Sequence, residues 1–470
     1  MKPYFIYSAV TVMALLAGGC TQTDGSDPVT SDYLNEVNLS FNLAVNANGK
    51  RQTRKLESSD CGQHVTDMRI YVFRSSTGGN DATFTYYRPQ VAGSDGAQDY
   101  FKVEAFDKDL PIIGDGVEEH PYSIRPRLPK GYYRFLAVGR DDDAADPDVN
   151  NVSIAWDEST TWSDAIISST DPYLSGEIFT GYPCGEGNKP LTYYVGDYTN
   201  YFKSTINLYR AVAGILLYVE NIPDELPSDF SWNATHTVEI TDEEGNKEES
   251  DELYTIIEKD KEYEISEIAV VAPGYNNQMN LWSRHWVENS FIAETGLFTA
   301  TRLVSIPVTD IREDSEEKEK KDSDGYYNVK RKLGSFVLPS QLAGRQVKLT
   351  YIPDAEDAQD ITYHFPASMY LAFFTEIDGK KYPVKMLPIS DSEQTSHLPG
   401  GPSFYTAEEL AVKRTQYNLI CNNIYCIGDY RTEGPNPPID NPIDLKEVIN
   451  KPELNITVIG NWQADVDINL

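Results

Sequence analysis

The chain has 470 residues, of which 40% are hydrophobic, and it carries a formal net charge of −33 at pH 7. This length predicts two domains of roughly 200 residues each, with enough apolar residues for packed cores. The negative charge repels nucleic-acid phosphates and anionic lipid headgroups, which argues against nucleic-acid binding and direct bilayer binding. Tyrosine occurs 31 times against 17 phenylalanines, a composition that favours half-buried β-strands.

Residues 1–19 have the form of an export signal peptide. Lys2 precedes an apolar run from Tyr4 to Ala17, which is too short to span a bilayer and has the length of a signal-peptide core. The run ends in L-L-A-G-G-C at Cys20. This is similar to the lipobox of bacterial lipoproteins, in which the cysteine is acylated, although Ala17 stands where leucine is more usual. Ordinary secretion with cleavage near Ala17 is the alternative.

The most regular alternation follows a polar tether at residues 21–32. From Val37 to Val45 apolar side chains share one face, and polar or small side chains share the other, which predicts a half-buried strand. The apolar face consists of Val37, Leu39, Phe41, Leu43 and Val45. A polar interval, Asn46–Ser59, follows and contains the basic stretch K-R-Q-T-R-K at Lys50–Lys55.

Further short strands are predicted in the first half of the chain. They span residues 65–73, 84–88, 100–105 and 131–139. In the first of them Met68, Ile70 and Val72 face one way, and Tyr71 and Phe73 face the other. The acidic run Arg140–Asn151 is predicted to be a solvated loop rather than a calcium site, because the spacing of an EF-hand is absent.

The most apolar run after the signal peptide is Ile206–Ile222, which predicts one long strand. Apolar residues occupy both parities between Ala211 and Val219, so we expect both faces to be covered. Arg210, if buried, needs a carboxylate or carbonyl partner. We place the domain boundary just before this run, which gives domains at residues 20–204 and 205–470.

Strands recur through the second half. They are predicted at residues 268–272, 296–304, 335–338, 347–352, 361–365, 369–375, 382–389 and 417–427. Arg312–Gly325 is predicted to be a charged, mobile loop or hairpin tip, Thr406–Lys413 one or two helical turns, and Glu433–Asp444 a proline-rich extended linker. Regularly spaced short strands with little helix predict an all-β sandwich or barrel.

The sequence contains none of the common catalytic or metal-binding motifs. The six histidines are isolated, and the zincin, P-loop, dinucleotide and G-x-S-x-G patterns are absent. We therefore expect no enzyme activity, no metal and no cofactor. Four cysteines remain besides Cys20, and they allow three disulfide connectivities; Cys421 and Cys426 would face opposite sides of one strand. The four are Cys61, Cys184, Cys421 and Cys426.

The chain ends on an alternating segment from Ile456 to Leu470 that predicts a last strand. Its apolar face consists of Trp462, Ala464, Val466, Ile468 and Leu470. The period matches that of the strand at Val37–Val45, as replacement of one strand by another requires. The alternative is that both segments are ordinary edge or core strands of an uncleaved monomer.

The order of these segments resembles the fimbrillin family, the subunits of the type V pili of Bacteroides-type bacteria. The resemblance spans nearly the whole chain and rests on strand motifs that are individually weak. They are the lipobox, V-N-L-S-F-N-L, V-T-D-M-R-I-Y-V-F, G-Y-Y-R-F-L-A-V, I-N-L-Y-R-A-V-A-G-I-L-L-Y-V, F-V-L-P-S and I-T-V-I-G-N-W.

The resemblance implies two transthyretin-like β-sandwich domains and export to the outer membrane and cell surface through lipid at Cys20. An arginine-specific protease would cut at Arg54 or Arg51 and remove the first strand. The C-terminal segment 445–470 of another pilin subunit would then fill the exposed groove. Stalk, tip and anchor roles stay open, as does the surface ligand, although the charged inserts fit a tip or accessory subunit.

A different class of function is also consistent with the sequence. A glycan-binding surface lipoprotein of a carbohydrate-uptake system would share the lipobox, the β-sandwiches and the aromatic surface. It would not need an arginine-rich interval after the first strand, nor a C-terminal strand behind a proline-rich segment.

Overall fold

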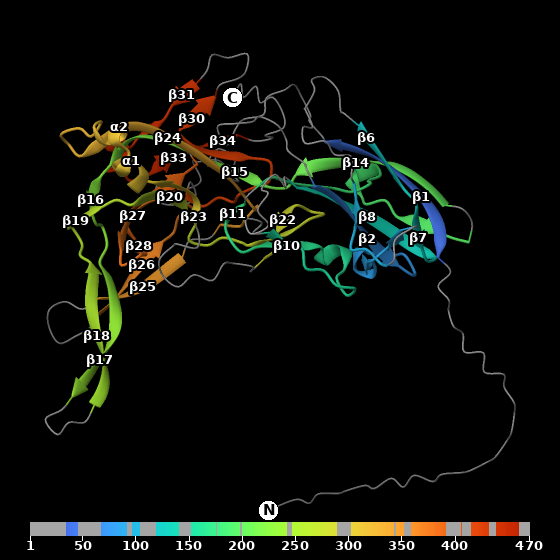
Figure 1. The fold of residues 1–470 in the computed structure, drawn as a ribbon, viewed down its shortest axis with the longest axis horizontal. Coiled ribbons are helices and arrows are strands. Elements are labelled where there is room, and N and C mark those ends of the chain that lie inside the picture. The colour runs from blue at the N-terminus through green and yellow to red at the C-terminus, as the bar shows by residue number, and fades with distance from the viewer. Residues whose placement is uncertain are drawn as a thin grey trace, which may run out of the picture.

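The computed structural model describes residues 34–45, 67–91, 96–103, 119–140, 152–174, 176–197, 200–241, 247–288, 302–342, 345–351, 359–391, 406, 415–431 and 439–459. Over these residues the chain is mostly β-strand with a few short helices, which confirms the predicted all-β class. In Figure 1 the strands gather towards the two ends of the long axis, with β1 and β2 at one end and β20 and β27 at the other. Within the described ranges, no helix is long and apolar enough to cross a membrane.

The largest sheet in the described part of the chain has eleven strands. They are β1 (Asn35–Val45), β2 (Asp67–Ser75), β3 (Thr85–Tyr87), β4 (Gln90–Val91), β5 (Phe101–Lys102), β6 (Glu119–Ile124), β7 (Pro126–Leu128), β8 (Gly131–Arg140), β12 (Ile178–Gly181), β13 (Tyr193–Val195) and β14 (Asn200–Arg210). The main path runs β3-β2-β8-β12-β14-β1-β7-β4, and β13, β5 and β6 pair with β8, β2 and β1.

This eleven-stranded sheet folds back on itself. Strands β8 and β1 are three places apart in the order, which in a flat sheet separates them by about 14 Å. Yet the rings of Phe41 on β1 and Phe135 on β8 are 5.2 Å apart. The two strands therefore lie in opposing layers, and the apolar cluster between the layers forms one core of the molecule.

The side chains of strand β2 point to the two sides that were predicted for them. Met68, Ile70 and Val72 are fully buried in the cluster between the layers. Tyr71 and Phe73 point to the other face and join a second, larger cluster. The predicted division of these side chains between the two faces is confirmed, and both faces of the sheet are covered at β2.

The apolar run Ile206–Ile222 is two strands rather than one, so that prediction is wrong. Strand β14 ends at Arg210, and β15 (Ala213–Pro223) begins a different sheet. The two residues between them are held by tertiary bonds: the Ala211 amide donates to the Ile178 carbonyl at 2.7 Å, and the Val212 carbonyl accepts from Asn422. The predicted coverage of both faces of β15 is confirmed, because every residue from Ala213 to Val219 is buried.

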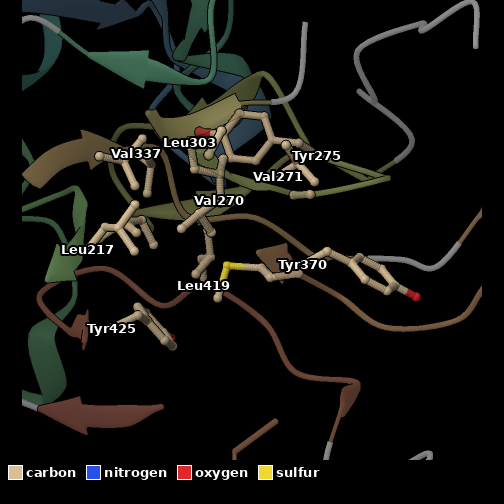
Figure 2. Packing of buried hydrophobic residues seen from close by; sticks show 14 of the residues in the cluster. Leu217, Val270, Val271, Tyr275, Leu303, Val337, Tyr370, Leu419 and Tyr425 are labelled. Carbon is tan, nitrogen blue, oxygen red and sulfur yellow. The ribbon is translucent and has the colours of Figure 1, made fainter. Parts of the chain in front are cut away.

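The second half contains two facing sheets. One has β11 (Tyr173–Leu174), β24 (Tyr326–Val337), β15, β29 (Ile424–Ile427), β34 (Thr457–Ile459) and β32 (Ile443–Asp444). The other has β23 (Arg302–Pro307), β20 (Glu267–Val271), β27 (Tyr370–Ile377), β28 (Lys380–Ser390) and β33 (Leu454–Asn455). Side chains of both meet in the larger cluster, among them Leu217 from the first sheet and Val270 from the second (Figure 2). This part is therefore a β-sandwich.

Residues of the first half are built into the second. Strand β11 pairs with β24, and a small sheet joins β9 (Val152–Ser153) and β10 (Ile166–Ser169) to β21 (Gln278–Asn280) and β22 (His285–Trp286). The buried Tyr275 hydroxyl contacts the carbonyls of Pro172 and Leu338, both at 3.2 Å. The predicted boundary between residues 204 and 205 falls within β14, and the division into domains stays a prediction.

Two-stranded hairpins and short helices complete the described chain. The hairpins pair β16 (Glu225–Pro227) with β19 (Glu262–Glu264), β17 (Trp232–Thr241) with β18 (Lys247–Ile257), β25 (Arg345–Tyr351) with β26 (Gln359–Phe365), and β30 (Asp429–Arg431) with β31 (Ile439–Asn441). The helices are α1 (Thr309–Glu313), α2 (Ser315–Lys318) and α4 (Leu445–Val448), with single 3-10 turns at Asp81–Thr83, Trp162–Asp164 and Glu186–Asn188. The β17–β18 hairpin, which projects from the body in Figure 1, was not predicted.

The charged segment Arg312–Gly325 is not the predicted loop. It includes the end of α1, all of α2 and a turn, and it is tied to the body through the buried carboxylate of Asp224. Arg312 contacts that carboxylate at 2.8 Å, and Lys321 contacts it as well. Burial alone would raise the pKa of Asp224, but the hydrogen bonds from Lys321 and Arg312 outweigh burial and lower it. Most side chains of this segment are exposed, and its contacts with Asp224 attach two short helices and a turn to the body.

Several other predictions meet a mixed outcome. Only Ile424–Ile427 of the predicted strand 417–427 is a strand, because Leu419 forms an isolated bridge to Ser340 instead. The end of the predicted linker Glu433–Asp444 is β31 and β32. Among the described cysteines, no disulfide joins Cys184, Cys421 and Cys426 to one another; Cys61 lies outside the described residues. Most of the segments 140–151, 296–304 and 406–413 also lies outside them.

Arg210 has the partner that its burial demands. Its side chain is 2% exposed, that of Glu177 is 6% exposed, and the guanidinium contacts the carboxylate at 2.7 Å. Burial lowers the pKa of the Arg210 guanidinium, and the Glu177 carboxylate opposes that effect. The pair lies where β14 leaves the first sheet, so it fixes the end of this strand.

We predict that Glu177→Gln lowers the free energy of unfolding by about 3–5 kcal/mol, because the buried charge of Arg210 loses its counter-charge. Urea denaturation followed by circular dichroism measures the change. The matched control is Glu258→Gln, which removes an exposed ion pair with Lys261 and should cost less than about 1 kcal/mol. Equal losses in the two variants would contradict a stabilising role for the buried pair.

Candidate functional site at the first strand

Strand β1 is an interior strand with neighbours on both sides. It runs parallel to β14, from Val37 opposite Asn200 to Val45 opposite Leu208. On its other side it runs antiparallel to β6, between Leu39 and Ala44, and it meets β7 at its beginning. Both backbone edges of β1 are therefore hydrogen-bonded to strands that come later in the chain.

The predicted apolar face of β1 points into the core. Val37, Phe41 and Leu43 are fully buried and Leu39 is 1% exposed. Asn38 and Ser40, on the opposite face, are partly exposed. Val45 pairs with Leu208 through its backbone, and its side chain lies outside what the structure describes. The period-2 pattern thus located the strand and its buried face correctly.

The walls of this site come from both layers of the folded sheet. Phe135 and Tyr133 on β8 belong to the same cluster as β1, as do Ile206 and Leu208 on β14. Four fully buried apolar side chains contribute roughly 6–12 kcal/mol, which is comparable to the total stability of a typical domain. Without β1 this surface and the edge of β14 would face water, so another strand would have to replace β1 in both respects.

The covalent attachment of β1 to the rest of the chain is limited. It ends at Val45, and the next described strand, β2, begins at Asp67 on the far side of the sheet order. The segment between them carries the basic stretch Lys50–Lys55. A single cut there leaves β1 held by non-covalent contacts alone.

The residues predicted for lipidation, cleavage and strand donation lie outside the described residues. They are Cys20, Arg51, Arg54, Trp462, Ala464, Val466, Ile468 and Leu470. Their predicted roles stay predictions. The structure does describe the chain immediately before the predicted donor residues.

The first part of the predicted donor segment 445–470 is built into the chain's own sandwich, and its donor role stays a prediction. Helix α4 buries Leu445 completely, and Ile456 is 6% exposed. Strand β33 pairs with β28, and β34 pairs with β29. The Lys446 ammonium also contacts Asp322 at 3.0 Å. Residues 445–459 therefore pack in the chain's own sandwich. The alternating pattern of Ile456–Leu470 concealed this because short docked strands alternate in the same way.

Sequence analysis missed the parallel partner of β1. Strand β14 begins at Asn200, ahead of the predicted start at Ile206. A signal was present, because Phe202, Ile206 and Leu208 alternate with polar residues along this segment. Serine at position 204 interrupts the apolar face and obscured the period.

Acidic residues are abundant, but the described residues contain no group of three or more His, Cys, Asp or Glu side chains that could hold a metal ion.

We predict that Phe41→Ala lowers the free energy of unfolding of the uncleaved chain by about 3–5 kcal/mol, because it opens a cavity between the two layers. Chemical denaturation measures this loss. Asn38→Ala changes the outer face of the same strand and should cost less than about 1 kcal/mol. A loss of less than about 1 kcal/mol in Phe41→Ala would show that β1 does not complete the core.

This chain is similar to several solved structures, and its sequence identity to each of them is low. No family model matches the chain, and no curated protein sequence matches it. A putative adhesin from Bacteroides thetaiotaomicron is 11% identical, with a TM-score of 0.31, over 84% of this chain and 91% of that chain. The tip fimbrial protein Mfa3 from Porphyromonas gingivalis, with C-terminal truncation, is 12% identical, with a TM-score of 0.27, over 90% and 99%.

The fimbrial anchor protein Mfa2 from the same organism is 8% identical, with a TM-score of 0.23, over 74% of this chain and 99% of that chain. Similarity at these scores carries no functional inference. The structural neighbours of this chain are fimbrial and adhesin proteins, at low sequence identity.

Proposed function

We propose that this chain is a structural and adhesive subunit of a cell-surface fimbrium that assembles by strand exchange. The observation that carries the proposal is the position of β1, which completes the core of the first sheet and yet is joined to the rest of the chain by one segment. That segment contains four basic residues within Lys50–Lys55. A protein that must lose and replace a strand needs this combination of deep burial and weak attachment.

Export as a lipoprotein through Cys20 would carry the subunit to the outer membrane and the cell surface. Cleavage at Arg54 or Arg51 would then release β1. The buried apolar face of that strand makes the uncleaved subunit stable during export, because the core is complete until the cut is made. Maturation outside the cell would therefore control when the site becomes available.

The donor strand would be the segment 460–470 rather than 445–470. Residues 445–459 pack against their own chain through the buried side chains of Leu445, Val448, Ile449, Leu454 and Ile456 and through the strand pairs of β33 and β34, so extracting them would expose that core. The following eleven residues match the length of β1, Asn35–Val45. They alternate apolar and polar side chains as a strand with one buried face requires.

Two sandwich domains of transthyretin-like type fit the arrangement of sheets. We place the division at Ala211 and Val212, between β14 and β15, instead of near residue 204. Segment 152–174 of the first half crosses into the second, which would join the domains firmly. Such a joint suits a subunit that transmits force along a fibre. The role within the fimbrium (tip, accessory, stalk or anchor) and the surface ligand stay open.

We predict that an arginine-specific protease removes the N-terminal segment of the full chain up to Arg51 or Arg54, and that the product then forms ladders on electrophoresis. The variant Arg51→Lys/Arg54→Lys keeps the charge but removes the arginine bonds, so it should stay uncleaved and monomeric. Deletion of residues 460–470 should allow cleavage but abolish the ladders.

Mass spectrometry locates the cut, and size-exclusion chromatography measures assembly. Ladders from the double-lysine variant, or ladders that survive deletion of residues 460–470, would contradict the proposed function. Binding to a glycan array together with a failure to assemble would favour the glycan-binding alternative.

A further inference from the structure

We infer that the site of β1 is shaped for a donor strand other than this chain's own tail: a strand with an aromatic ring at its centre and a leucine-sized side chain on either side. The inference rests on the proposed strand exchange and names the partner. It follows from comparing the side chains that β1 buries with those that residues 460–470 offer.

The centre of the site is occupied by an aromatic ring. Phe41 is fully buried, and its ring lies 5.2 Å from that of Phe135 at an interplanar angle of 59°. On the same face it is flanked by Leu39 and Leu43, which are 1% and 0% exposed. Val37 follows towards the start of the strand. The site is therefore wide in the middle, and it requires substantial side chains at both neighbouring positions.

The tail distributes its bulk differently. Only one of its faces is apolar, because Gln463, Asp465 and Asp467 occupy the other. The inward face would consist of Gly460, Trp462, Ala464, Val466, Ile468 and Leu470. Its one large ring lies near the beginning of the segment, between the two smallest residues.

In the register that matches the two patterns end to end, Val466 falls on the site of Phe41. This holds for a parallel and for an antiparallel strand, because Val466 is the middle member of the alternating set from Trp462 to Leu470. The ring contact with Phe135 is then lost, and a space the size of several carbon atoms is left between the layers. Ala464 falls on one of the two leucine sites and leaves a second space.

Shifted registers do not correct the mismatch. If Trp462 takes the place of Phe41, the residues on either side are Gly460 and Ala464, and they fall on both leucine sites. This is again true in either direction. If Leu470 takes the central place, no ring faces Phe135. Intermediate registers place Ala464 or Ile468 at the centre, without a ring.

A close-packed wall makes such underfilling costly. The residues that line the site also pack against β2 and β8, so they cannot collapse into the spaces without disturbing the rest of the core. A site discriminates between two donor strands when their binding free energies differ, and unfilled spaces under one strand produce such a difference. The site therefore binds the tail of a different subunit more tightly than this chain's own tail, so mixed assembly is preferred over the weaker ladders that identical copies form by themselves.

Peptide exchange into the full chain, cleaved with an arginine-specific protease, tests the inference. Fluorescence anisotropy would follow binding of labelled peptides: residues 35–45, residues 460–470, and the 460–470 peptide carrying A464L/V466F. The matched control, Q463L/D465F, adds apolar bulk of the same kind to the opposite face. We expect the 35–45 peptide to bind at least about tenfold more tightly than the native tail peptide. A464L/V466F should regain most of this difference, and Q463L/D465F should not.

Native tail binding as tight as that of the 35–45 peptide would overturn the inference and leave the proposed strand exchange intact. A gain in Q463L/D465F equal to that in A464L/V466F would also overturn it, because hydrophobicity alone would then account for binding. If no peptide binds, including 35–45, the site does not exchange strands, and the proposed function fails together with the inference.

Discussion

The burial of one face of β1 between two layers of a folded sheet is the interaction on which the first half of the molecule depends. Phe41 meets Phe135 across those layers, and β14 lies alongside β1 throughout the strand. Because the strand is interior, both its side chains and its backbone are needed to close the core. A segment so placed contributes far more stability than its length suggests, and its removal creates a specific vacancy.

The second half provides a stable base for this arrangement. Its two sheets pack face to face, and strands from the first half are paired into it. The chain's own residues 439–459 also return to this sandwich, where α4, β33 and β34 are buried or paired. Residues 445–459 are therefore part of the chain's own sandwich.

The alternation of apolar and polar residues predicted the position of single strands and which of their side chains are buried. It located β1 and assigned Met68 and Tyr71 to opposite faces of β2. The prediction that a buried Arg210 needs a carboxylate or carbonyl partner is met by Glu177. Alternation failed where a neighbour distant in sequence decides the outcome. The break at Ala211 is fixed by bonds to Ile178 and to the segment near Asn422, and no local signal marks it.

The same limit explains the candidate site. The apolar face of β1 could be predicted from its period, but its parallel pairing with β14 could not, since parallel strands have no turn to reveal them. The docking of residues 445–459 was hidden for a related reason: short strands that alternate look alike whether they stay in their own subunit or leave it. The segment 460–470 alternates as β1 does, but its side chains differ in size from those of β1 at matching positions.

Amide hydrogen exchange along β14, from Asn200 to Leu208, tests most directly whether β1 is a replaceable interior strand. The measurement compares the intact chain, the chain after cleavage and removal of β1, and that product with the 35–45 peptide added back. The account predicts strong protection in the intact chain, loss of protection when β1 is gone, and recovery when the peptide binds. Protection of β14 that persists after β1 is removed, or that the peptide does not restore, would contradict it.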